Sequence, residues 1–274
     1  MPRNSCLLLS ACLGLVAIGA AVHAAEPSVD PQLRAVVASR ARSPENKARD
    51  QYRHPLQTLT FFGIRPSMTV VELWPFGGWY TEILAPYLRD HGRLYAAAMD
   101  PTSTDREDIE SNSQLQAMFS AHPELFDKVQ LSVLAPGKMQ IAPDGSADMV
   151  LTFRNIHNWV WAGMEKDVFA AAYRALKPGG ILGVVEHRNN DPNAVPAKGQ
   201  AYVGEQYAVN LIESVGFTLA GRSDINRNPK DTKDYPKGVW TLPPSFAEGE
   251  KDHAKYAAIG ESDRFTLKFV KPKS

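Results

Sequence analysis

The sequence predicts an α/β protein in which a mostly parallel, seven-stranded sheet carries helices on both faces. The chain has 274 residues, 44% of them hydrophobic, which is enough for the core of one large domain. Apolar runs of strand length recur along it, at residues 67–73, 92–100, 128–134, 147–153, 181–187, 218–225 and 263–272. Segments with helical spacing separate most of these runs, at residues 80–90, 105–121, 165–180 and 201–217.

This alternation also predicts where a ligand would bind. Strands that alternate with helices pair in parallel through right-handed crossovers. Such sheets bind their ligands beyond the carboxyl ends of the strands. Functional residues are therefore expected in the turns that follow the strands.

The beginning of the chain, residues 1–24, has the layout of a secretory signal peptide. One basic residue precedes an apolar run at residues 6–22, and small residues follow at Ala24 and Ala25. Cleavage near this point predicts a periplasmic or secreted protein with no stable membrane span. A retained membrane anchor and a lipid attached to Cys12 are the alternatives.

Bulk properties argue against several classes of function. The only cysteines, Cys6 and Cys12, lie in the leader, so the mature chain would contain no disulfide and no cysteine metal site. The 30 Lys and Arg residues balance 30 Asp and Glu residues, which argues against nonspecific nucleic-acid binding. No histidine pair has H-x-x-x-H spacing, and no G-x-S-x-G elbow is present. We therefore expect neither a bound metal nor a nucleic-acid partner.

The remaining chain divides into an N-terminal helical segment, residues 25–66, and a main domain, residues 67–274. Helices are expected at residues 31–40 and 56–64, with a charged loop between them. This segment is a candidate lid over the ligand site. Arg53 in its loop is interpreted either as a ligand for a carboxylate or as a solvated surface charge.

The stretch VVELWPFGGWYTEILAPYL has the order of a strand, a turn and a helix. A helix that begins in such a turn presents free N–H groups to a ligand. The turn lacks the G-x-G-x-x-G spacing of a dinucleotide site, because Trp74, Pro75 and Phe76 precede its glycine pair. A nicotinamide-dependent oxidoreductase is therefore disfavoured.

S-adenosylmethionine (SAM) suits this turn better because it has no phosphates. Such a site needs an acid for the ribose hydroxyls, and Asp100 ends the second predicted strand. Glu72, near the end of the first strand, is placed to contact the amino group of the methionine part.

Over Met68 to Pro272 the sequence resembles the class I SAM-dependent methyltransferases. The resemblance rests on VVELWPFGGWYTEIL at the first strand, MD at the end of the second, DGSADMVLTFRNIHNW at the fourth, LKPGGILGVVEH at the fifth and ESVGF before the sixth. More narrowly, GGWYTEIL, TFRNIHNW, GVWTLPP and GESDRFTL are similar to a group of predicted exported bacterial methyltransferases.

The resemblance implies a Rossmann-like sheet closed by an antiparallel C-terminal strand, with SAM as the cofactor. Its cofactor-binding residues are expected to be Glu72, Trp74, Gly77, Gly78, Tyr80, Asp100, Arg154 and Asn155. The usual first motif continues as G-x-G-x-G, and here only the last glycine, Gly78, matches it. Phe76 stands where the narrower group has a glycine.

The stretch RNIHNWVW after the fourth strand is the main candidate for chemistry. His157 is the candidate general base, because an imidazole titrates near neutrality. Asn155 and Asn158 would orient a substrate, and the two tryptophans would line its pocket. The alternative interpretation is that His157 caps the next helix and the tryptophans belong to the core.

The EHR triplet after the fifth strand is a second polar cluster at the same edge. Glu186 and His187 would form an acid–base pair there, or only a hydrogen bond at the rim of the site. His157 and His187 are thus the two catalytic candidates. The predicted function is methyl transfer from SAM to a small-molecule acceptor outside the cytoplasm; the alternative is a non-catalytic protein that binds a small ligand on the same scaffold.

Overall fold

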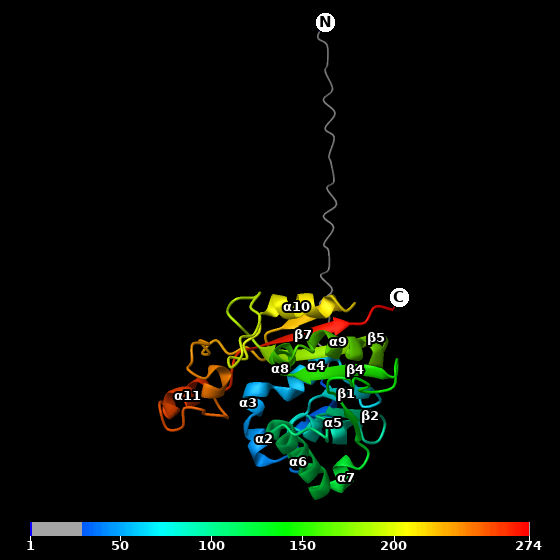
Figure 1. The fold of residues 1–274 in the computed structure, drawn as a ribbon. Helices are drawn as coiled ribbons and strands as arrows, with labels where there is room; N and C mark the ends of the chain where they lie inside the picture. The colour runs from blue at the N-terminus through cyan, green and yellow to red at the C-terminus, as the bar shows by residue number, and fades with distance from the viewer. Residues whose placement is uncertain (2–28, 274) are drawn as a thin grey trace.

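The computed structural model describes residue 1 and residues 29–273 (Figure 1). The expected signal peptide, residues 1–24, lies outside the described residues apart from Met1. In the part of the chain that is described, no helix is both long and apolar enough to cross a membrane.

The centre of the molecule is one seven-stranded sheet with the order β3-β2-β1-β4-β5-β7-β6. Its strands are β1 (Thr69–Leu73), β2 (Arg93–Ala98), β3 (Gln130–Val133), β4 (Ala147–Phe153), β5 (Leu176–His187), β6 (Thr218–Ser223) and β7 (Arg264–Val270). Strands β1 to β5 pair in parallel, and β7 runs antiparallel to both β5 and β6. The predicted doubly wound sheet with an antiparallel C-terminal strand is confirmed.

Most strands lie where the apolar runs predict them, and β5 is the informative exception. The sequence predicts that helix 165–180 ends at the Pro-Gly-Gly triplet, but the helix ends at Ala175 and β5 begins at Leu176. Gly179 and Gly180 exchange backbone hydrogen bonds with Lys271, just beyond β7. The triplet therefore extends the sheet, because this pairing satisfies the Gly179 N–H and the Gly180 carbonyl.

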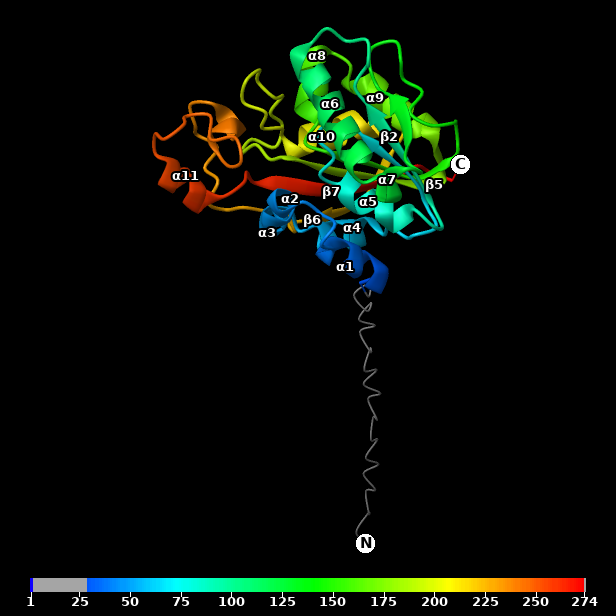
Figure 2. The ribbon, with the colours of Figure 1, turned by 90° about the horizontal axis from the view of Figure 1, so that it is seen from below.

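The helices cover both faces of the sheet. They are α1 (Pro31–Ala38), α2 (Pro44–Ala48), α3 (Asp50–Arg53), α4 (Pro55–Phe62), α5 (Thr81–Leu88), α6 (Arg106–Ala121), α7 (Pro123–Phe126), α8 (Ile156–Ala162), α9 (Glu165–Ala175), α10 (Glu205–Glu213) and α11 (His253–Ile259). One hydrophobic core lies between the sheet and α8, α9 and α10, and a second between the sheet and α1, α4 and α5. Figure 2 shows α1 and α4 on the side of the sheet opposite α9 and α10.

A long segment between β6 and β7 lies at the edge where β1, β4 and β5 end (Figure 1). The sequence predicts a loop at residues 228–246, and the structure places there a 3-10 turn, η1 (Gly238–Thr241), before helix α11. The segment is fixed from within, because buried Asp231 accepts hydrogen bonds from the Tyr202 hydroxyl and the Asp263 N–H.

The N-terminal helical segment reaches the same edge. Its charged loop forms the two short helices α2 and α3. The Trp79 indole donates to the Asn46 carbonyl at 3.1 Å, and Arg53 pairs with Glu261 across 208 residues of sequence. Helices α2 and α3 therefore bring arginine side chains to the carboxyl ends of the strands.

Candidate active site

Two adjoining cavities lie at the carboxyl edge of the sheet. The first, the β1 cavity, has a volume of about 280 Å³ and is lined by Glu72, Trp74, Gly77 and Tyr80. The second, the β5 cavity, has a volume of about 250 Å³ and is lined by His157, His187, Trp240 and Arg264. Both cavities share a wall made of Arg49, Arg53, Phe76, Phe153 and Arg154.

Glu72 is a buried carboxyl group on the wall of the β1 cavity. Its Oε2 accepts a hydrogen bond from the Thr81 hydroxyl at 2.7 Å. Burial raises the pKa of Glu72 to about 7, although the Thr81 bond and the charge of Arg154 act in the opposite direction. A cationic ligand group in this cavity would favour the ionised form, so the expected role beside an amino group is chemically suitable.

The turn after β1 is closed by the protein's own side chains. Trp74 and Phe76 adopt positive φ angles of 44° and 50°, which non-glycine residues rarely occupy. The Trp74 indole donates to the Leu134 carbonyl at 2.8 Å, and its ring packs edge-on against Trp159. Trp74 therefore lines the β1 cavity as part of a packed aromatic cluster.

Helix α6 covers the glycine pair in this turn. A Cβ on Gly77 would lie 2.8 Å from Gln114 Oε1, and one on Gly78 would lie 2.4 Å from Met118 Cε. Gly78 has φ 80°, so it also supplies a backbone conformation that few other residues adopt. These glycines bring α6 close to the turn, and the space that a Cβ would fill is occupied by α6 side chains.

Asp100 lies outside the cavity linings. Its carboxylate accepts hydrogen bonds from Lys138 Nζ at 2.6 Å and from the N–H and hydroxyl of Thr102. The Lys138 bond, and then the bonds from Thr102, lower the pKa of Asp100 to about 2. The structure therefore does not bring Asp100 together with Glu72 at one cavity.

Tyr80 and Phe153 form the aromatic part of the β1 cavity. Their rings stack with centroids 3.5 Å apart and an interplanar angle of 9°. Burial raises the pKa of the Tyr80 phenol to about 12, so the phenol stays protonated at neutral pH. Aromatic faces of this kind suit a cationic ligand group.

Glu261 gathers arginine side chains from distant parts of the chain. Its carboxylate pairs with Arg49 Nε at 2.5 Å, with Arg53 Nε at 3.0 Å and with Arg264. Burial alone would raise the pKa of Glu261, but the surrounding guanidinium groups outweigh burial and hold this pKa far below its usual range.

Arg154, directly after β4, has no hydrogen bond or ion pair from its guanidinium group to the other described residues. Its φ angle of 65° turns the chain sharply at the cavity. Burial and then the charge of Arg264 lower the pKa of Arg154 to about 10. The folded protein therefore disfavours this charge, and an anionic ligand would stabilise it.

Asn155 supports the strand ends from the core. Its Nδ2 donates to the Leu73 carbonyl at 2.9 Å and to Thr152 Oγ1 at 3.2 Å, so it joins the ends of β1 and β4. The side chain is buried and forms no part of the two cavity linings. Asn155 is thus placed behind the site expected for it.

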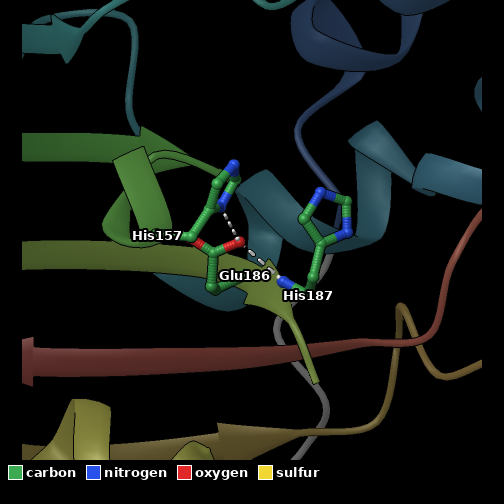
Figure 3. Close-up of side chains that lie close together, drawn as sticks. All are labelled: His157, Glu186 and His187. Carbon is green, nitrogen blue, oxygen red and sulfur yellow. Dashed lines mark hydrogen bonds and ion pairs between the residues drawn. The ribbon is translucent and has the colours of Figure 1, made fainter. Parts of the chain in front are cut away.

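His157 and Glu186 form a hydrogen-bonded pair beside His187 (Figure 3). His157 Nδ1 lies 3.2 Å from Glu186 Oε1, and this carboxylate also accepts from the backbone N–H groups of Ile156 and His187. Because a carboxylate can only accept, we assign the proton of His157 to Nδ1. The second ring nitrogen points away from Glu186 (Figure 3) and has no hydrogen-bond partner among the described residues.

His187 is held separately, by the Ser262 hydroxyl at 2.6 Å from its Nδ1. Burial, and then the charges of His157 and nearby arginines, keep the pKa of His187 well below its usual value. His187 is therefore neutral at physiological pH. The acid–base pair expected between Glu186 and His187 is formed instead by Glu186 and His157.

The same three side chains offer ligand atoms within 4.8 Å of one another, a separation that a metal ion could bridge. Glu186, however, already accepts three hydrogen bonds, two of them from backbone groups. The guanidinium groups of Arg154 and Arg264 face the same cavity and would repel a cation. This environment suits proton transfer better than metal binding.

The sequence did not assign roles to several residues that the fold brings to the site. Arg49, Trp240, Glu261 and Arg264 line the β5 cavity. Three of them lie in GVWTLPP and GESDRFTL, two of the strings that carry the resemblance. Those two strings were therefore the signal in the sequence that could have identified these residues, but only the three-dimensional structure shows that they lie near His157.

No protein-family model matches the sequence, and no curated protein matches it significantly. Solved structures do match. A SAM-dependent methyltransferase from Aquifex aeolicus is 15% identical with a TM-score of 0.55, over 84% of this chain and 94% of that one. The [4+2]-cyclase SpnF is 14% identical with a TM-score of 0.56, over 89% and 93%. A putative sarcosine dimethylglycine methyltransferase from Galdieria sulphuraria is 13% identical with a TM-score of 0.54, over 84% and 87%.

These similarities establish that the chain has the Rossmann-like fold of class I SAM-dependent methyltransferases. One of the similar proteins is named as a cyclase, which illustrates that a fold does not define a chemistry. The chemistry must therefore be argued from the two cavities.

The β1 cavity fits the methionine part of SAM. This part combines a carboxylate, an ammonium group and a sulfonium, and the cavity supplies the guanidinium group of Arg53, buried Glu72 and the Tyr80–Phe153 aromatic pair. The adenosine part has less support, because Asp100 is bound to Lys138 and the glycine pair is covered by α6.

Proposed function

We propose that this protein is a SAM-dependent methyltransferase that acts on a small molecule. The observation that carries the proposal is the junction of the two cavities. Two partners suited to an amino acid, Glu72 and Arg53, adjoin an imidazole whose second ring nitrogen has no partner among the described residues. One cavity would hold the cofactor and the other the acceptor.

In this proposal Glu72 holds the amino group of the cofactor, and an arginine of the shared wall holds its carboxylate. Tyr80 and Phe153 would face the positive sulfonium with their aromatic rings. SAM, when bound, supplies an electrophilic methyl group. The protein itself contributes position and orientation, which account for much of the rate in such transfers.

His157 is the proposed general base. Its Nε2 would accept the proton of an acceptor hydroxyl in the β5 cavity. Glu186 acts as a positioning residue: it fixes the ring through Nδ1 and stabilises the imidazolium that forms. His187 stays neutral and stands beside the acceptor as a hydrogen-bonding group.

Isothermal titration of residues 25–274 with SAM and, separately, with S-adenosylhomocysteine tests the proposal. We expect micromolar binding of both, and at least tenfold weaker binding to Glu72→Gln because a charge-assisted hydrogen bond contributes about 1.5–3 kcal/mol. Absence of binding at millimolar ligand, with a folded protein by circular dichroism, would refute it.

A non-catalytic small-ligand protein on this scaffold is the second candidate. It is favoured by Asp100, whose carboxylate is already bound to Lys138 and Thr102. In that case both SAM compounds would fail to bind, while small ligands without an adenosine part would still enter the cavities.

We further propose that the protein acts in the periplasm or is secreted after cleavage near Ala24 or Ala25. The support is the apolar run at residues 6–22 followed by small residues. N-terminal sequencing of protein from an exported fraction tests this. An intact Met1 in the cytoplasmic fraction would contradict it, and labelled palmitate on Cys12 would support lipid attachment instead.

A further inference from the structure

The walls of the β5 cavity carry more positive than negative charge. The arginines that line it are Arg49, Arg53, Arg154 and Arg264, and its acids are Glu107 and Glu261. His157 and His187 line the same cavity as these guanidinium groups. In a partly buried cavity such an excess is costly unless a ligand compensates it.

The guanidinium groups also have unused hydrogen-bond donors. Arg49 and Arg53 each use Nε for Glu261, and their terminal nitrogens have no acceptor within the described part of the chain. Arg154 uses none of its side-chain nitrogens to bind another residue of the described chain. None of these terminal nitrogens is among the fully buried side-chain atoms that lack a hydrogen-bond partner, so each of them keeps some accessible surface. Guanidinium groups arranged like this match the paired oxygens of a carboxylate or phosphate.

The β5 cavity also has apolar lining residues. They are Phe76, Phe153, Val239, Trp240 and the Pro243-Pro244 pair. With a volume of about 250 Å³, the cavity is at the small end of ligand sites. A compact molecule with an apolar body would contact these apolar side chains, and a bare inorganic anion would not.

We propose that the acceptor is a small oxyanion with an apolar body: a carboxylate or phosphate group binds Arg154 and its neighbours, and a hydroxyl on the same molecule faces His157. The methylation of this molecule rests on the proposed function, whereas its binding in the β5 cavity does not. Bound SAM would add to the positive charge of the site, because its ammonium and sulfonium outweigh its carboxylate. The acceptor is therefore the component that brings negative charge.

Equilibrium titration of residues 25–274 with benzoate tests the proposal. Benzyl alcohol is the neutral control of similar shape, benzylamine is the cationic control, and inorganic phosphate is the anion without an apolar body. Chloride keeps the ionic strength constant, because salt weakens such contacts. We expect benzoate to bind at least tenfold more tightly than benzyl alcohol, and benzylamine not to bind. Phosphate should bind more weakly than benzoate.

Two variants of Arg154 and one control variant test whether benzoate binds in the β5 cavity. Arg154→Gln should weaken benzoate binding by about 10- to 100-fold, the effect of one charge-assisted contact. Arg154→Lys should restore part of the affinity because it keeps the charge. Arg222→Gln, on β6 and paired with Glu205 away from the cavity, should leave it unchanged.

The outcomes separate this inference from the proposed function. Equal binding of benzoate and benzyl alcohol, or benzoate binding that Arg154→Gln leaves unchanged, overturns the oxyanion site even if S-adenosylhomocysteine binds. Arg154-dependent benzoate binding without any S-adenosylhomocysteine binding supports the oxyanion site and refutes the methyltransferase.

Discussion

The turns after β1 and β4 lie at the same edge of the sheet, but they differ in whether their polar side chains are bonded within the protein. After β1, the Trp74 indole is bonded to a carbonyl, and α6 fills the space in front of the glycine pair. After β4, the Arg154 guanidinium and one His157 nitrogen have no partner among the described residues. Both turns include non-glycine residues with positive φ.

The difference indicates that the first turn stabilises the fold, whereas the second turn presents groups that can interact with a ligand. In the first turn, strained backbone is held by packing between aromatic rings and α6. In the second, the strained residue itself carries a charge toward the shared cavity wall. Free donors and acceptors in a buried setting are costly, so the free groups of Arg154 and His157 after β4 indicate where a ligand interacts.

The largest expected effect belongs to the second turn. His157→Gln should lower the rate of methyl transfer by roughly 100- to 10,000-fold, the range contributed by a general base. Binding of S-adenosylhomocysteine should stay within about twofold, because His157 does not line the β1 cavity. The measurement is transfer of labelled methyl from SAM to hydroxyl-bearing small carboxylic acids.

His122→Gln is the matched control for this variant, because His122 is exposed at the end of α6 and contacts only Glu124 through its side chain among the described residues. Transfer by His157→Gln within tenfold of wild type would show that the free imidazole nitrogen is not a base. The contrast between the two turns would then not be catalytic.

The next effect comes from Glu72 and depends on pH. Its pKa in the folded protein is about 7, above the unfolded value of 4.5, so the folded state holds the proton more tightly. The free energy of unfolding should therefore fall as pH rises from about 4.5 to 7 and then level off. The loss from this group is at most ~3 kcal/mol.

Glu72→Gln removes this titration. Urea unfolding between pH 5 and pH 8 should show a smaller decline for Glu72→Gln than for wild type, with the variant more stable at pH 8. Parallel curves for the two proteins would mean that Glu72 is not desolvated. The β1 cavity would then be more open to water than its packed turn indicates.

Much of the sheet could be predicted from sequence because buried parallel strands are continuous apolar runs. The fourth run matches β4 at both ends, Ala147 and Phe153. Helix α11 was not predicted because the segment around it is polar, with one buried residue in the helix, Tyr256. Periodicity identifies elements that face a large core, and this helix does not.

The candidate site could be predicted only in part for a related reason. His157 follows β4, and Glu186 and His187 end β5, its neighbour in the sheet, so their meeting follows from the strand order. Glu261, by contrast, pairs with Arg49 and Arg53, which lie more than 200 positions earlier in the chain. No local pattern encodes such a pairing. Asp100 shows the converse, because its sequence position suits a ribose but Lys138 holds its carboxylate.

A smaller effect tests the packed turn itself. Gly78→Ala should destabilise the protein by ~2 kcal/mol, because its φ of 80° disfavours a side chain and the new Cβ would meet Met118. Gly77→Ala should cost under ~1 kcal/mol, since its Cβ would meet only the flexible end of Gln114. Urea unfolding of both variants measures the difference. Equal losses would contradict the close fit of α6 on Gly78.

The smallest effect is an increase in stability, and it tests the contrast between the two turns most directly. Arg154→Gln should stabilise the ligand-free protein by ~1 kcal/mol, because it removes a half-buried charge that has no partner among the described residues. For a chain of this size that is roughly 2–4 °C in Tm. Arg154→Lys keeps the charge and the φ of 65°, so its Tm should stay near that of wild type. A lower Tm for Arg154→Gln would mean that the guanidinium is stabilised within the fold. A higher Tm together with lost oxyanion binding would show that Arg154 binds the ligand and lowers the stability of the ligand-free protein.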